Sequence, residues 1–316
     1  MKNIKNLLIF VKTFFFSKDL YLINSPSQYL CLVEWILFSN IDQKNIKVII
    51  GYTSDSSIKQ IKDIHKKYYN ITNIFFLGEI IKENYFKVIL NFYKVFSVKK
   101  NCTVVGDYKY YLFKPIYKKS DKIIFLDEGL SLTRFDYDSI KNNNYKLFSI
   151  FKNLNNNFLI YNNYNFLKKE IKNLNIISNR IFLLGTAAAD FDLITEDFYY
   201  QKILSFVNLY KSSEIFFIPH RNENKYKKFK FPYNLITKNL NLPIEFAITQ
   251  LSEMPDKIAG FYSMSLFNLS IILVEQKINL INISYDKNNY TNSEIKKSFE
   301  VVTSLQQFKN IQQLFI

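Results

Sequence analysis

Short apolar runs alternate with segments of helical periodicity along the first half of the chain. The runs are rich in Ile, Leu, Val and Phe and are typical of buried strands, whereas apolar residues spaced three and four apart predict helices. The predicted strands are Leu20–Asn24, Lys47–Gly51, Asn73–Leu77, Cys102–Gly106 and Lys122–Leu126, and the predicted helices are Gln28–Phe38, a segment containing Ile58, Ile61 and Ile64, and Glu79–Phe96. This alternation predicts a largely parallel sheet with helices on both faces.

The pattern is interrupted at 136–176 and then starts again. The interrupted stretch is rich in Asn, Lys and Tyr and lacks Gly and Pro, so it predicts a loop and helix that join two domains. The later predicted strands are Arg180–Gly185, Glu214–Ile218, Glu245–Ala247, Lys257–Phe261, Ser270–Val274 and Asn279–Ile283, with a helix at Tyr199–Tyr210. We therefore expect an α/β protein with a Rossmann-like domain at 1–150, a linker at 151–176 and a second Rossmann-like domain at 177–316. Two such domains with a cleft between them form the GT-B architecture.

Two predicted strands end abruptly in residues that can carry acid–base chemistry. Phe125-Leu126-Asp127-Glu128-Gly129 delivers two carboxylates and a glycine, and Phe217-Ile218-Pro219-His220-Arg221 delivers one of only two histidines in the chain. Ligands of open parallel sheets bind beyond the carboxyl ends of the strands. These two strand ends therefore indicate an enzyme, although Asp and Gly also favour ordinary turns and His220 is followed by surface-type lysines.

Several motifs occur in the order found in one family of transferases. Leu22-Ile23-Asn24-Ser25-Pro26-Ser27-Gln28 resembles the opening strand and turn of glycosyltransferase family 52, which contains bacterial lipooligosaccharide sialyltransferases. Asp127-Glu128-Gly129 resembles the acidic motif, and Pro219-His220-Arg221 the histidine motif, of bacterial sialyltransferases. Glu245 and the serine pair Ser263 and Ser265 then follow, as in those families, so the resemblance covers roughly residues 20–285. In the family the histidine motif usually reads His-Pro and the hydroxyls are often adjacent.

The resemblance implies transfer of a sialic-acid-type sugar from its CMP conjugate to a glycan hydroxyl, with inversion. It implies that Asp127, with Glu128 second, is the general base and that His220 binds the departing phosphate, helped by Ser263 and Ser265. Glu245 would accept hydrogen bonds from the ribose. The remaining residues expected in the donor or acceptor site are Gly129, Gly185, Thr186, Arg221, Ser25 and Gln28.

A second pair of carboxylates competes with Asp127 for the role of base. Leu184-Gly185-Thr186 ends a predicted strand and leads to Asp190 and Asp192. Gly185 would permit close approach of the nucleotide because it has no side chain. The residues alone leave open which carboxylate takes the proton.

Composition bears on partners more than on fold. The net charge of +15 favours an anionic partner, although the abundance of Lys, Asn and Ile is also what an AT-rich genome produces. The basic run Lys225–Lys230 interleaves Lys with Tyr226 and Phe229, so a non-enzymatic nucleic-acid- or membrane-binding protein is an alternative, as is a GT-B transferase with a different nucleotide sugar. We expect an anionic membrane surface rather than nucleic acid. A homodimer is permitted by the resemblance.

Two cysteines without a CxxC pattern predict no disulfide and no zinc site, and the resemblance requires neither a metal nor a cofactor besides the CMP-sugar donor. No apolar run approaches the roughly 18 residues of a membrane span, so we expect a cytoplasmic protein, peripheral on the inner face of the membrane. The tail at Phe308–Ile316 predicts an amphipathic helix.

Overall fold

The computed structural model divides into two compact units, residues 1–162 and 163–316, each built on one parallel sheet. The boundary between the units lies inside the predicted linker. The structure describes residues 7, 10–12, 14, 19–41, 46–68, 73–95, 103–106, 114–117, 120–127, 144–152, 157–171, 174–261, 263–284 and 308–316. Every strand pairing among these residues is parallel. This confirms the predicted α/β class with two Rossmann-like domains.

The first unit contains a seven-stranded sheet of order β3-β2-β1-β4-β5-β6-β7 within the described residues. Its elements are β1 (Asp19–Ile23), α2 (Pro26–Phe38), β2 (Lys47–Ile50), α3 (Asp55–Lys67), β3 (Asn73–Phe76), α4 (Leu77–Ile80), α5 (Glu83–Val95), β4 (Thr103–Gly106), α6 (Lys114–Tyr117), β5 (Lys122–Leu126), β6 (Tyr145–Ser149) and β7 (Leu159–Tyr161). The strand order reverses between β1 and β4, as in Rossmann domains. Phe86 and Leu90 of α5 pack against Leu22, Val104 and Ile123 on one face of the sheet.

The second unit contains a six-stranded sheet of order β10-β9-β8-β11-β12-β13 within the described residues. Its elements are α7 (Asn165–Glu170), β8 (Asn175–Leu184), α8 (Glu196–Leu209), β9 (Glu214–Ile218), η5 (Lys225–Lys228), β10 (Leu235–Thr237), α9 (Ile244–Ala247), η6 (Ile248–Gln250), β11 (Glu253–Gly260), α10 (Met264–Ile272), β12 (Asn279–Ser284) and β13 (Ile311–Phe315). Numbered within the unit, this is the Rossmann order 3-2-1-4-5-6, with its reversal between β8 and β11.

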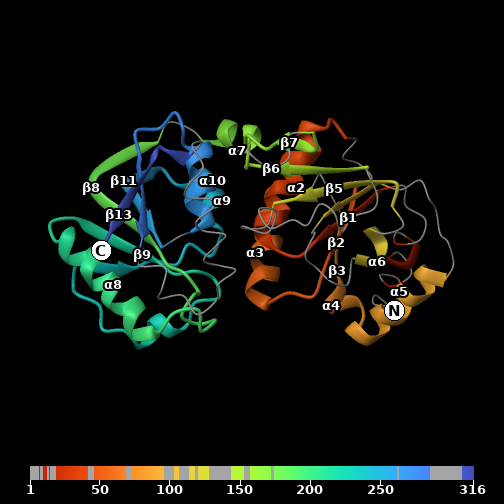
Figure 1. Ribbon diagram of the computed structural model, residues 1–316, viewed down its shortest axis with the longest axis horizontal. Helices are drawn as coiled ribbons and strands as arrows, with labels where there is room; N and C mark the ends of the chain where they lie inside the picture. The colour runs from red at the N-terminus through yellow and green to blue at the C-terminus, as the bar shows by residue number, and fades with distance from the viewer. Residues whose placement is uncertain are drawn as a thin grey trace. The chain divides into compact units, whose positions relative to one another are not determined.

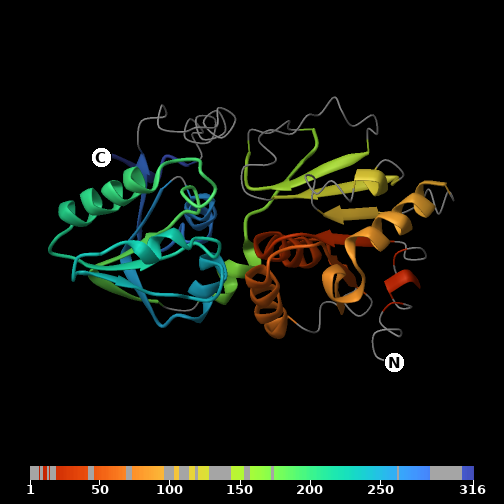
Figure 2. The same cartoon turned by 90° about the horizontal axis from the view of Figure 1, so that it is seen from below.

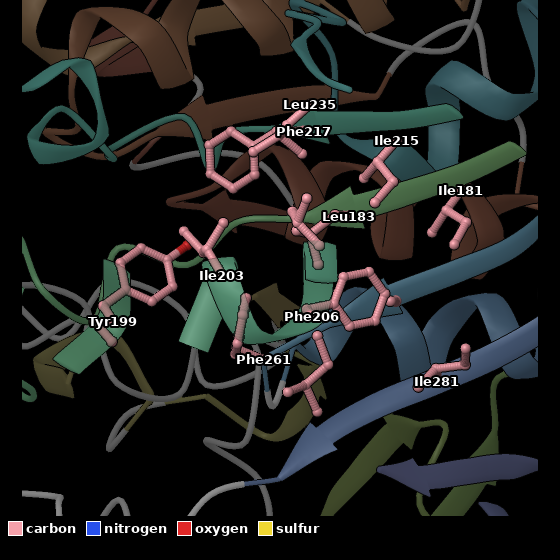
Figure 3. Packing of buried hydrophobic residues seen from close by; sticks show 14 of the residues in the cluster. Ile181, Leu183, Tyr199, Ile203, Phe206, Ile215, Phe217, Leu235, Phe261 and Ile281 are labelled. Atoms are coloured by element: carbon pink, nitrogen blue, oxygen red, sulfur yellow. The ribbon is translucent and has the colours of Figure 1, made fainter. Parts of the chain in front are cut away.

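Helices cover both faces of the second sheet (Figures 1 and 2). Figure 3 shows the core under α8, where Tyr199, Ile203 and Phe206 meet Leu183 of β8 and Phe217 of β9. Helix α10 contacts β11, β12 and β13 and also α7 and α9, which places it on the other face. The apolar strands are buried on both faces because each face has its own helices.

Four sequence predictions about secondary structure are wrong. The segment predicted as a loop and helix also contains β6 and β7, which pair with each other and extend the first sheet. Glu245–Ala247 forms the short helix α9, and Ser270–Val274, predicted as a strand, lies largely in α10. Since α10 is buried almost all round, its apolar run has no period that separates a helix from a strand.

The fourth wrong prediction concerns the C-terminal tail. The tail at Phe308–Ile316 forms strand β13 beside β12, not an amphipathic helix. Only four apolar residues supported the helical period, and in a stretch this short they also fit an edge strand in which Ile311 is buried. His65 of α3 is half-buried, and its Nδ1 lies 2.9 Å from the hydroxyl of Tyr29.

Candidate functional site

Three neighbouring strands of the second sheet end at the same level. Each is followed by polar residues that the sequence predicted to lie in the functional site. In the register of the sheet, Leu184 of β8 pairs with Ile218 of β9 on one side and with Gly260 of β11 on the other. His220 follows β9, Gly185 and Thr186 follow β8, and Ser263 follows β11. The reversal of strand order between β8 and β11 is the usual position of a ligand site in such sheets.

His220 lies in a tight turn that fixes its ring. The backbone N–H of Asn222 donates to Nδ1 of His220 at 3.2 Å, so the neutral ring carries its proton on Nε2. Burial, with a smaller contribution from the charge of Arg221, lowers the pKa of His220 to about 4. The side chain is therefore a neutral hydrogen-bond donor at pH 7.

A buried carboxyl that sequence reasoning missed connects these residues. Glu223 accepts hydrogen bonds from the backbone N–H of His220 and from the hydroxyl of Tyr199, both at 2.8 Å. The Tyr199 oxygen in turn accepts from the backbone N–H of Thr186 at 3.0 Å. The one signal in the sequence was a carboxylate three residues after His220, within a polar stretch that reads as a solvated loop.

Gly185 lies against this carboxyl. A Cβ atom at position 185 would stand 2.1 Å from Oε2 of Glu223 and 3.0 Å from the ring of Phe217. The sequence predicted that Gly185 permits close approach of a nucleotide. In the structure, the group that lies close to Gly185 is the carboxyl of Glu223.

We expect Gly185→Ala to lower the free energy of unfolding by about 2 kcal/mol or more, as overpacked interiors do. Both Glu223 oxygens are hydrogen-bonded, so the carboxyl cannot swing away without losing those bonds. Chemical denaturation measures the change. Gly78→Ala is the matched control, because a Cβ there meets only Tyr52 at 3.7 Å. Equal losses in the two variants would contradict the clash.

Glu245 and the serines occupy neighbouring elements. Glu245 is buried in α9 and accepts a hydrogen bond at 2.8 Å from the side chain of Asn268 in α10. Ser263 precedes α10 at its N-cap position without a side-chain cap bond, and Ser265 lies in the first turn of that helix. The N-terminus of α10 thus presents backbone N–H groups at the carboxyl edge of β11.

Asp190 and Asp192 are both engaged with the segment that follows His220. Asp190 accepts hydrogen bonds from the backbone N–H groups of Asn224 and Lys225, at 2.9 and 3.3 Å. Asp192 is exposed and forms an ion pair with Lys225 at 2.9 Å. The rings of Tyr226 and Phe229 pack against Phe217 and Tyr199, so the aromatic members of the basic run face the core.

In the first unit, Asp127 follows β5 at the carboxyl edge of the sheet and is buried. Its Oδ2 accepts from the backbone N–H of Ile150 at 2.7 Å, whereas its buried Oδ1 has no hydrogen-bond partner among the residues that the structure describes. Burial raises the pKa of Asp127 to about 7, against the opposing effect of hydrogen bonds from Ile150 and Ser149. A carboxyl that ionises near neutral pH suits a general base. The predicted site residues Glu128 and Gly129 lie outside the described residues.

Ser25 and Gln28 are both buried at the start of α2. Ser25 Oγ accepts from the backbone N–H of Gln28 at 3.3 Å, and Gln28 Oε1 accepts from that of Asn24 at 2.9 Å. The first bond satisfies a donor that the first turn of the helix leaves open, and the second holds the residue before the N-cap. The predicted opening motif therefore has a capping role in the structure.

Two further properties of the described residues bear on ligands and location. No three His, Cys, Asp or Glu side chains in this part of the chain gather closely enough to hold a metal ion. Within the same ranges, every helix falls short of the length and apolar character needed to cross a membrane.

No protein-family model matches the sequence, and no curated protein matches it. Among solved structures, the chain is similar to UDP-GlcNAc 2-epimerase from Methanocaldococcus jannaschii, with 12% identity and a TM-score of 0.47 over 93% of each chain. The resemblance to glycosyltransferase family 52 stays a prediction.

Proposed function

We propose that the protein is an inverting glycosyltransferase that moves sialic acid, or a related nonulosonic acid, from its CMP conjugate to a glycan hydroxyl. The observation that carries the proposal is the common edge of β9, β8 and β11, where His220, Thr186 and Ser263 follow strands in matched register. We expect the acceptor to be lipooligosaccharide or another surface glycan, reached at the inner face of the cytoplasmic membrane.

The phosphate of the CMP-sugar can accept hydrogen bonds from N–H and O–H groups at this edge of the second sheet. Nε2–H of His220 can donate to a phosphate oxygen, and the N-terminus of α10 offers backbone N–H groups and the hydroxyl of Ser263, which makes no cap bond to the helix. A helix N-terminus favours an anion because of its dipole and its unpaired N–H groups. These groups stabilise the negative charge that develops on CMP as it leaves, without a proton transfer.

Glu245 gives the site a group for the ribose. One of its oxygens is held by Asn268, and a carboxylate oxygen can accept from a ribose hydroxyl. Glu245 is buried within the same unit that carries His220.

The acceptor is activated by Asp127 in this proposal. The acceptor oxygen forms a bond to the anomeric carbon while the bond from that carbon to the phosphate oxygen breaks, and CMP takes the electron pair. The acceptor proton passes to Asp127, whose Oδ1 accepts no hydrogen bond from the described part of the chain. A single displacement of this kind inverts the anomeric configuration.

Ligand-dependent thermal unfolding tests the donor. We expect CMP to raise the melting temperature, with a stabilisation of about 2.7 kcal/mol at 100 times the dissociation constant, while UDP and GDP do not. Incubation with CMP-sialic acid and a panel of galactose-terminated acceptors should then release CMP. A shift with UDP or GDP alone would replace the proposal with a transferase for another nucleotide sugar. Salt-sensitive binding of DNA or RNA without any nucleotide effect would point to a non-enzymatic basic protein.

A further inference from the structure

Glu223 is a buried carboxyl that the proposed chemistry does not use, and it joins two strand ends. Oε2 accepts from the backbone of His220, after β9, and Oε1 accepts from Tyr199, whose oxygen accepts from the backbone of Thr186, after β8. The backbone N–H of Glu223 also donates to the carbonyl of His220 at 2.8 Å, which closes the turn at 220–223.

The same turn sets the direction of the His220 ring. Asn222, whose N–H holds Nδ1 of that ring, is the residue directly before Glu223. If the carboxyl is removed, the backbone N–H of His220 loses its partner and the turn loses one of its bonds. The ring is then free to leave the orientation in which Nε2–H is its open donor.

We propose that Glu223 is a positioning residue that fixes the His220 turn and the Gly185–Thr186 turn in one arrangement at the edge of the second sheet. Its importance for the donor rests on the proposed function, because only that function gives the His220 ring a phosphate to bind. Gly185 is part of the same arrangement, since only a residue without Cβ leaves room for the carboxyl.

The network can exist with the carboxyl charged or neutral. Burial raises the pKa of Glu223 to about 8, with Asp190 as the nearby like charge and the bonds from His220 and Tyr199 opposing the rise. Burial, and to a smaller extent the charge of Glu223, raises the pKa of Tyr226. A neutral carboxyl keeps one oxygen for the N–H of His220 and can donate from the other to Tyr199. Glutamine offers the same two groups, so Glu223→Gln is the conservative variant.

Proton NMR of the two histidines measures the arrangement without any donor. His65→Gln assigns the two ring signals, because only one of them remains. In the wild type the His220 ring should titrate near pH 4. In Glu223→Ala we expect it to titrate closer to the ordinary value of 6.5, because the opened turn exposes the ring to water. Glu223→Gln should restore the low value. Glu196→Gln is the control, since it removes ion pairs to Lys225 and Lys228 of the same loop and leaves the Glu223 carboxyl with its bonds to His220 and Tyr199 in place.

The affinity for CMP is the second quantity to measure. We expect Glu223→Ala to weaken it about tenfold, the value of one lost buried hydrogen bond, and Glu223→Gln to stay within about threefold of the wild type. If Glu223→Ala does not fold, Tyr199→Phe decides, because it removes only the hydroxyl between Glu223 and Thr186. It should move the His220 titration in the same direction by a smaller amount.

The two proposals fail in different ways. A folded Glu223→Ala variant, or Tyr199→Phe in its place, with an unchanged His220 titration would overturn the positioning role whatever CMP does. If the His220 titration changes as expected but the protein does not bind CMP, the positioning role is upheld and the proposed function is contradicted.

Discussion

Asp127→Asn is expected to stabilise the fold at pH 8 and to abolish most of the glycosyl transfer. Burial holds the folded-state pKa of Asp127 at about 7 against 3.8 when unfolded, a difference of roughly 4 kcal/mol. The folded state therefore binds the proton more tightly, so stability is complete below pH 3.8 and falls as the pH rises toward 7. Asn removes this loss because it has no charge. Transfer should fall about 10²–10⁴-fold, as when a general base is removed.

Thermal unfolding of the wild type and Asp127→Asn at pH 4 and pH 8 measures the first effect. The melting temperatures should lie close together at pH 4 and separate at pH 8, with the variant higher. Asp121→Asn is the matched control, because Asp121 is exposed just before the start of the same strand β5. A constant difference at the two pH values would mean that the pKa of Asp127 is the same in the folded and the unfolded state.

His220→Ala is expected to lower kcat/KM for the CMP-sugar by about 10²–10³-fold, as for the loss of a donor to a developing oxyanion. His220→Gln should recover a large part, because a side-chain amide also presents an N–H. This recovery is expected only because the pKa of His220 is about 4, which makes the ring a neutral donor and not an acid at pH 7. Steady-state kinetics with varied CMP-sialic acid measures both variants.

The pH profile of kcat/KM distinguishes the role of Asp127 from that of His220. It should fall below about pH 7 because Asp127 becomes protonated, and this limb should persist in His220→Gln. His65→Gln is the control and should leave the rate unchanged, since His65 contacts Tyr29 in the first unit. If His220→Gln is as inactive as His220→Ala, His220 acts by proton transfer and not as a neutral donor.

The sequence predicted the strands that carry the candidate site with small errors in their ends. Lys122–Leu126 and Glu214–Ile218 form strands within the predicted bounds, because each is a short apolar run stopped by polar residues. Their parallel pairing followed from the alternation with helices. The sequence predicted Asp127 and His220 as site residues because a strand end in such a sheet is where ligand-binding side chains gather.

The apolar pattern could not separate elements that are buried all round or lie at an edge. Helix α10 and strand β13 were each predicted as the other kind of element. Hydrophobic periodicity arises when one face of an element is exposed to solvent and the other is buried. Helix α10 has almost no exposed face. Pairing with β12, a contact between segments about 30 residues apart, decides the conformation of the tail.

By itself the sequence determined the α/β class, the two Rossmann-like domains and the positions of Asp127 and His220 at strand ends, because these depend on local apolar runs and their polar stops. Only the tertiary structure determined the pKa values of these two side chains and the hydrogen bonds that hold the site residues in place. The pKa of Asp127 rises, and that of His220 falls, through burial by residues distant in the chain. Glu223 joins β8 to β9 through Tyr199 of α8, and no local pattern encodes a contact among three separate elements.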